Sequence, residues 1–107
     1  MLKFIVVCHR RTGSSREEFR RYFREVHGPL ALAIPHVSRY VLSFVEPDPV
    51  EGDPQWDALV EFWCADRDAY DAAWRSPEAQ RAIADNPRFL DLTKTGSAIV
   101  EEVVLRL

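Results

Sequence analysis

The spacing of apolar residues alternates between two periods along the chain, and this order constrains the fold more than any other feature. Apolar and β-branched residues predict strands at residues 2–9, 37–46, 56–65 and 97–105. Two intervening regions repeat at helical spacing. The order β-α-β-β-α-β predicts an α+β, ferredoxin-like split βαβ fold with a four-stranded antiparallel sheet and helices on one face.

The first helical region carries an apolar stripe that ends in a glycine–proline pair. The stripe consists of Phe19, Tyr22, Phe23, Val26, Leu30 and Ala33. Ser14 or Ser15, each followed three residues later by Glu, predicts a capping box at the start. Gly28-Pro29 predicts a kink or break, because proline lacks the backbone donor and disfavours helical geometry before it. His27 lies at the edge of the stripe, and Pro35 marks the outer limit of the region.

Two caps divide the second helical region. Asp66 predicts the start of a helix that runs through Arg75. Ser76, with proline in the first turn after it, predicts a restart. This second piece is expected to end near Asn86-Pro87.

Size and charge exclude several classes of protein. A chain of 107 residues with 47% hydrophobic residues predicts one globular domain, residues 1–107. The net charge of −3 argues against a nucleic-acid partner. No apolar run approaches the roughly 20 residues of a membrane span, and the N-terminus lacks the pattern of a signal peptide. We therefore expect a cytoplasmic protein without a membrane partner, in which Cys8 and Cys64 are buried thiols.

The predicted strands are apolar on both faces, although the helices can cover only one. In the first strand, for example, Phe4 and Val6 alternate with Ile5 and Val7. An uncovered apolar sheet face would promote aggregation. The sequence therefore predicts a homodimer in which two sheets pack face to face, and leaves open which face is used.

An ordered set of motifs resembles the EthD domain. The first helix carries Phe19-x-x-Tyr22-x-x-x-x-His27-Gly28-Pro29. Pro35 before Arg39-Tyr40, Glu61-x-Trp63, Ser76-Pro77-Glu78 and Phe89-Leu90-Asp91 follow in order. The resemblance covers essentially the whole chain.

Membership of this family implies the dimeric α/β barrel superfamily. Its relatives include small cofactor-free enzymes: isomerases, polyketide cyclases and anthrone-type monooxygenases. Other EthD proteins are accessory components without a defined reaction. In relatives, the histidine that matches His27 lines a pocket between helix and sheet.

Three candidate residues carry groups that can transfer a proton or donate a hydrogen bond. His27 can move a proton near neutral pH, so it is the candidate catalytic acid or base. The alternative is a boundary histidine that bonds a free carbonyl at a helix end. Tyr22 and Tyr40 can donate hydrogen bonds to a bound carbonyl or enolate, or be core residues with satisfied hydroxyls.

The third predicted strand adds a carboxylate and an aromatic residue. Asp57 and Glu61 share a mostly apolar face, so one of them could be a general base or orient His27. Alternatively, they are solvated or pair with Arg39 across the sheet. Trp63, and Phe89 further along the chain, supply flat apolar surface for an aromatic ligand, or plain core.

The histidines and cysteines lack the spacing of metal sites, so we expect no metal and no cofactor, although the sequence does not exclude haem.

The main hypothesis is a cofactor-independent enzyme of the isomerase, cyclase or monooxygenase type. It would act on a cyclic carbonyl or phenolic compound. The alternative is a non-catalytic accessory protein that binds or carries a small hydrophobic or aromatic molecule.

Overall fold

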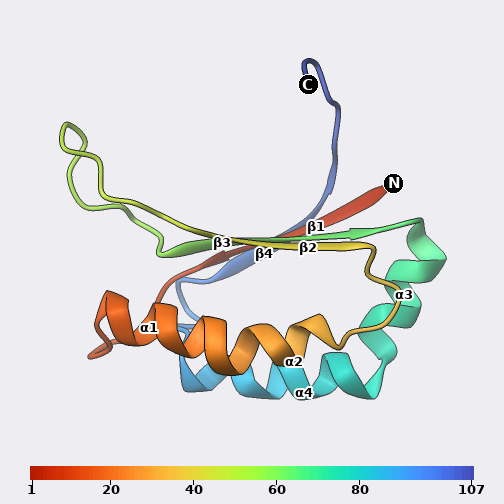
Figure 1. Ribbon diagram of the computed structural model, residues 1–107, viewed down its shortest axis with the longest axis horizontal. Coiled ribbons are helices and arrows are strands. Elements are labelled where there is room, and N and C mark those ends of the chain that lie inside the picture. Colours follow the sequence, from red (N-terminus) through yellow and green to blue (C-terminus); the bar gives the residue numbers. More distant parts are fainter.

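A computed structural model describes residues 1–107 as one sheet covered on one side by helices (Figure 1). The strands are β1 (Leu2–Cys8), β2 (Arg39–Phe44), β3 (Ala58–Cys64) and β4 (Gly96–Glu101). All neighbours are antiparallel, in the order β2-β3-β1-β4. The predicted α+β, ferredoxin-like fold is therefore confirmed.

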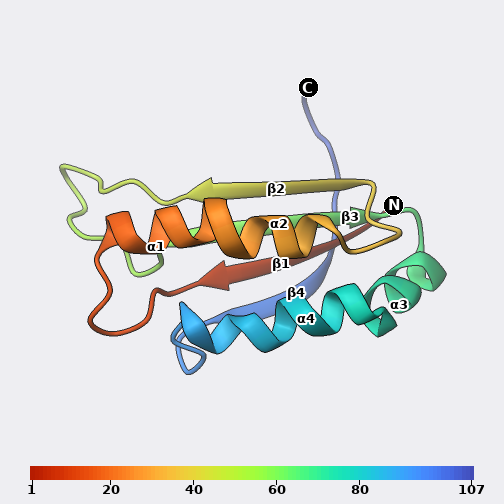
Figure 2. The ribbon, with the colours of Figure 1, turned by 60° about the horizontal axis from the view of Figure 1, so that its bottom comes forward.

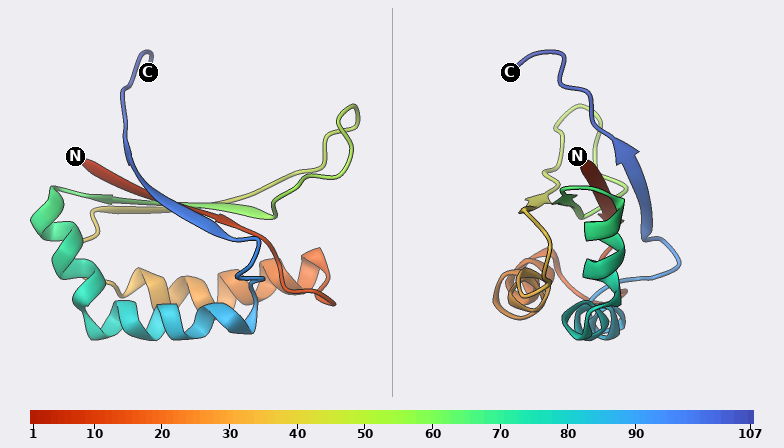
Figure 3. Two further views of the ribbon diagram at one scale, coloured as in Figure 1. Left: turned by 180° about the vertical axis from the view of Figure 1, so that it is seen from behind. Right: turned by 90° about the vertical axis from the view of Figure 1, so that its right-hand side faces the viewer.

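The helical layer consists of two rods that lie side by side beneath the sheet (Figures 2 and 3). The first rod is α1 (Arg16–Tyr22), a π-helix (Phe23–His27) and α2 (Gly28–Leu32). The second is α4 (Pro77–Asp85), preceded by α3 (Arg67–Arg75) and followed by a 3-10 turn (Asn86–Arg88). The expected caps form, because Ser15, Asp66 and Ser76 each accept a hydrogen bond from the backbone N–H three residues later.

The last strand is shorter than the sequence predicts. The expected strand at 97–105 ends at Glu101, which pairs with Leu2. The pairing of β4 with β1 ends at this pair. Residues 102–107 then leave the sheet on the side opposite the helices (Figure 1). Glu102 anchors this departure, since its carboxylate accepts hydrogen bonds from Trp63 Nε1 at 3.2 Å and Lys3 Nζ at 3.0 Å.

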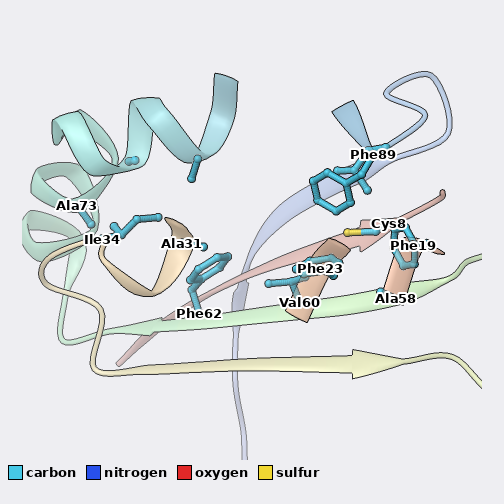
Figure 4. Close-up of a cluster of buried hydrophobic side chains, with 13 residues drawn as sticks. Cys8, Phe19, Phe23, Ala31, Ile34, Ala58, Val60, Phe62, Ala73 and Phe89 are labelled. Atoms are coloured by element: carbon cyan, nitrogen blue, oxygen red, sulfur yellow. The ribbon is translucent and has the colours of Figure 1, made fainter. Parts of the chain in front are cut away.

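The face of the sheet toward the helices forms the core (Figure 4). Phe62 of β3 is central to it, and its ring stacks on Tyr40 at 4.6 Å between centroids. Phe19 and Phe23 of the first rod are each only 1% exposed. Phe89, just after the 3-10 turn, packs against both, with centroids 5.8 and 5.0 Å away. These aromatic contacts join the two helical rods.

The opposite face of the sheet carries no helix and is partly apolar. The strand register places Ile5, Val41, Leu59 and Ala98 on this open face. Trp63 lies on the same face between two cations, Lys3 at 4.8 Å and Arg39 at 4.7 Å from the ring centroid. Glu61, which pairs with Lys3, lies between Ile5 and Val41 on this face, so the open face mixes apolar and charged side chains.

The sequence predicted a kink or break at Gly28-Pro29. The first rod instead continues through this pair and widens into a π-turn just before it. The Gly28 N–H donates to Phe23 O, five residues back. A Cβ at position 28 would lie 2.7 Å from that same oxygen. The wider turn accommodates the missing N–H of Pro29 without ending the helix, and the close approach of the two backbones requires glycine.

This π-turn changes which residues face the core. Val26, expected on the apolar stripe, is 42% exposed, whereas His27, expected at its edge, is 7% exposed. Phe19, Phe23, His27 and Ala31 are all buried at a constant spacing of four. That spacing overshoots a regular α-helical turn of 3.6 residues, and the extra residue of the π-turn corrects it.

We expect Gly28→Ala to lower the free energy of unfolding by about 1–3 kcal/mol, because its Cβ must push Phe23 O away. Helix propensity alone predicts the opposite sign, a gain of up to ~1 kcal/mol. Urea unfolding measures the difference. Gly96→Ala is the matched control, since a Cβ there meets nothing within 4 Å. A stabilised Gly28→Ala protein would show that the turn does not need glycine.

Candidate functional site

A cavity of about 370 Å³ lies between the sheet and the helical layer. Fifteen of its twenty lining residues are hydrophobic, among them Phe23, Phe62 and Trp74. Ile83, Gly96 and Ser97 are lining residues that are also exposed, so the cavity opens between α4 and β4. The volume and the apolar wall are typical of a small-molecule site.

His27 lines this cavity and is held by a buried carboxylate. Its Nδ1 lies 3.0 Å from Oδ2 of Asp85, which is 8% exposed on α4. The other ring nitrogen, Nε2, makes no hydrogen bond within the protein and is not sealed off from solvent. The imidazole therefore joins the two helical rods through Nδ1 and leaves Nε2 without a protein partner.

Asp85 has two further neighbours. The Tyr22 hydroxyl donates a hydrogen bond of 2.7 Å to its Oδ1. Arg88 Nε lies 3.8 Å from the same oxygen, on a side chain that is 76% exposed. Sequence reasoning missed Asp85, although a signal was available: it follows Ala79 and Ala82 at steps of three, on the buried stripe of α4.

Burial lowers the pKa of His27 below its usual value, and the hydrogen bond and charge of Asp85 oppose that shift only in part. Near neutral pH the ring is therefore uncharged. An ionised Asp85 can only accept, so the ring proton sits on Nδ1 and the lone pair on Nε2. This arrangement makes Nε2 the basic nitrogen of a residue that lines an apolar cavity.

The two candidate tyrosines have different surroundings. The Tyr22 hydroxyl points at Asp85. Burial raises the pKa of Tyr22, and the hydrogen bond and charge of Asp85 raise it further. Tyr40 lines the cavity, and burial raises its pKa to about 12. Its hydroxyl is buried without a partner, as is Nε1 of Trp74 on the same wall. Both atoms are sealed in this conformation, so a ligand reaches them only if the wall shifts.

Phe89 lies beside the histidine. Its ring centroid is 4.5 Å from that of His27, and the residue lines the cavity. Of the six residues singled out in the sequence, His27, Tyr40 and Phe89 thus line the cavity, while Tyr22 lies outside it and bonds Asp85. The structure adds Asp85 to these residues.

Asp57 and Trp63 do not join this group. Asp57 accepts hydrogen bonds from the backbone N–H and the guanidinium of Arg10, both at 2.8 Å, and so ties β3 to the end of β1. Its partner is not Arg39, which lies over the Trp63 ring instead. Trp63 belongs to the open face of the sheet. Asp85, rather than Asp57 or Glu61, is the carboxylate that orients His27.

The fold and the cavity define a small α+β protein of the ferredoxin-like class with a pocket between sheet and helices. Residues 11–93 match the sequence profile of the EthD domain. The chain belongs to the EthD domain family, which confirms the resemblance seen in its motifs. No functionally curated protein shows significant similarity to it.

Solved structures share the fold over nearly the whole chain. An ethyl tert-butyl ether (EthD) family protein from Bacillus halodurans superposes with a TM-score of 0.83 at 20% identity, covering 96% of this chain and 99% of that one. SnoaB, a cofactor-independent oxygenase from Streptomyces nogalater, gives 0.69 at 13%, covering 97% and 95%. A dimeric ferredoxin-like protein of unknown function from Thermobifida fusca gives 0.67 at 16%, covering 92% and 88%.

Two further properties concern metals and membranes. No three His, Cys, Asp or Glu side chains gather closely enough to hold a metal ion. None of the helices combines the length and apolar character that a bilayer crossing requires.

The lowered pKa of His27 predicts how stability depends on pH. Between the ordinary histidine value near 6.5 and the lower folded value, the unfolded chain binds more protons, so stability falls as the pH falls through this window. We expect His27→Gln to flatten the curve between pH 7 and pH 5.5. Urea unfolding at several pH values measures the difference between the two proteins. Parallel curves would contradict a buried, neutral His27.

Proposed function

We propose that the protein is a cofactor-independent enzyme of small-molecule metabolism that acts on a cyclic carbonyl or phenolic compound. The observation that supports this most strongly is the His27 imidazole, held through Nδ1 by buried Asp85 with Nε2 free at the wall of an apolar cavity. A base in such a site is positioned by its partner and has little competition from water.

The common first step is removal of a proton from a carbon or a phenol beside the carbonyl group. His27 Nε2 accepts that proton. When it comes from carbon, the electron pair left behind moves onto the carbonyl oxygen as an enolate, and when it comes from a phenol, the pair stays on the phenol oxygen as a phenolate. Return of the proton to another carbon gives isomerisation. Attack of the enolate on a second carbonyl carbon gives cyclisation, and the alkoxide that forms takes the proton back from His27. Oxygenation would require dioxygen as a co-reactant after the same deprotonation.

Asp85 and Tyr40 have supporting roles in this proposal. Asp85 stabilises the imidazolium that forms at His27, at a separation of 3.0 Å. Tyr40 remains protonated, since its pKa is about 12, and its unpaired hydroxyl is a donor for an oxyanion once the wall adjusts. Phe89 and the other aromatic walls contact the ring of the ligand.

The rest of the wall suits a second function. Because most lining residues are hydrophobic, the same cavity would also serve a non-catalytic protein that carries or sequesters a hydrophobic molecule. The two functions differ in one respect: only the enzyme needs the proton-accepting nitrogen of His27.

Hydrogen–deuterium exchange tests the base directly. We expect the protein to accelerate exchange at the acidic carbon of 2-tetralone, a bicyclic ketone, as followed by proton NMR in deuterated buffer. His27→Gln should slow the catalysed exchange by roughly 10²–10⁴ per folded molecule, because glutamine cannot accept a proton near neutral pH. Folded fractions must be measured in parallel, since His27 is buried and its loss leaves Asp85 short of a partner.

His36→Asn is the matched control. His36 is an exposed histidine with a φ of 65°, a conformation that asparagine tolerates well, so its loss should leave exchange unchanged. Equal rates for the wild type and folded His27→Gln would leave the carrier function as the better explanation.

We also propose that two copies associate through their open faces. The apolar residues of that face, among them Val41 and Leu59, have no helix to cover them within one chain. Residues 102–107 rise on the same side (Figure 3, left) and expose Val103, Val104, Leu105 and Leu107. A second copy on the open face would bury both surfaces. The Thermobifida fusca protein of the same fold is dimeric, which supports this arrangement.

Light scattering at micromolar concentration should give about 25 kDa, twice the 12.4 kDa of one chain. Val41→Asp should dissociate or unfold the dimer, because it places an unpaired carboxylate in the interface. Leu32→Asp is the control, since Leu32 is 72% exposed on the helical side and should not affect assembly. A folded wild-type monomer would overturn the proposal.

A further inference from the structure

The cavity wall carries no charge. None of its twenty lining residues is Asp, Glu, Lys or Arg. The titratable groups that remain on it are His27, Cys8, Tyr40 and Tyr70. Burial raises the pKa of the thiol and of both phenols, so these three stay protonated and neutral at pH 7. His27 is neutral too, for the reason given above.

A carboxylate lies behind the histidine of the cavity wall. Asp85 lies directly behind His27, with its two oxygens taken by the imidazole and the Tyr22 hydroxyl. Its nearest cation, Arg88, is 3.8 Å away and mostly in solvent, so water screens it. An anion in the cavity would therefore lose its hydration, find no cation on the wall, and be repelled by Asp85.

We infer that the ligand of this cavity is an uncharged aromatic molecule with a ketone or phenol oxygen, and that the site rejects the matching carboxylate. The inference rests on the proposed function in taking this cavity as the ligand site, but it does not require His27 to be catalytic. It narrows the substrate class to molecules whose acidic groups are neutral when they enter.

Two naphthalene probes of the same shape provide the test. Calorimetry at pH 7.5 compares 2-acetonaphthone, a neutral ketone, with 2-naphthoate, its carboxylate counterpart. We expect the ketone to bind at least about 100-fold more tightly, because burying an unpaired carboxylate has a large desolvation cost. Binding of the carboxylate within a few-fold of the ketone, or no binding of the ketone, would overturn the inference.

A lysine at the opening of the cavity tests whether the probes bind there. Ile83 lines the cavity and is 49% exposed, so Ile83→Lys adds a cation where the chain can accommodate it. This variant should bind 2-naphthoate more tightly than Ile83→Gln does, with little difference between the two for the ketone. Failure of the lysine to favour the carboxylate would show that the probe binds elsewhere and would count against the inference.

The outcomes separate this inference from the proposed enzyme. A strong preference for the ketone with no exchange activity would support a neutral ligand and reject the catalytic function. Exchange that depends on His27, together with tight binding of the carboxylate, would support the catalytic function and reject the neutral ligand.

Discussion

The contact between Phe89 and the first helical rod is the one on which the architecture of the site depends. Phe89 follows α4 and packs its ring against Phe19, Phe23 and His27 at once. This contact fixes the distance between the two rods at one end of the layer. Farther along, small residues such as Ala31 and Ala82 line the space between the rods and the sheet, and the cavity occupies that space. Phe89 thus packs beside the histidine whose Nδ1 bonds Asp85 across the two rods.

Much of the fold could be predicted from the sequence because the signals for it are local. Caps at Ser15, Asp66 and Ser76 need only a side chain and a backbone N–H three residues apart, so they are visible in the sequence. The order of strands and helices follows from apolar periodicity in the same way. The end of β4 was not visible, because it depends on where its pairing with another strand, β1, stops.

The site was only half accessible to sequence reasoning. His27 was marked by its glycine–proline neighbours, but its partner Asp85 lies 58 residues away and meets it only through tertiary packing. Asp57 had a plausible pattern on its strand, yet Arg10 at the end of the neighbouring strand takes up both its oxygens. Which carboxylate meets which cation is decided between elements, and no spacing within one element encodes it.

The π-turn at Gly28 has a consequence for how the helix can vary. A helix with one residue more than its regular turns require cannot lose that residue without rotating one half against the other, by about 100°. Deletion of a single residue from 23–27 would restore ordinary helical geometry. It would also turn His27 and Ala31 away from the face that Phe19 and Phe23 share. Substitutions on the outer side of the rod leave this geometry unchanged. A change in the number of residues in the rod does not, because it moves the His27 ring off the buried face.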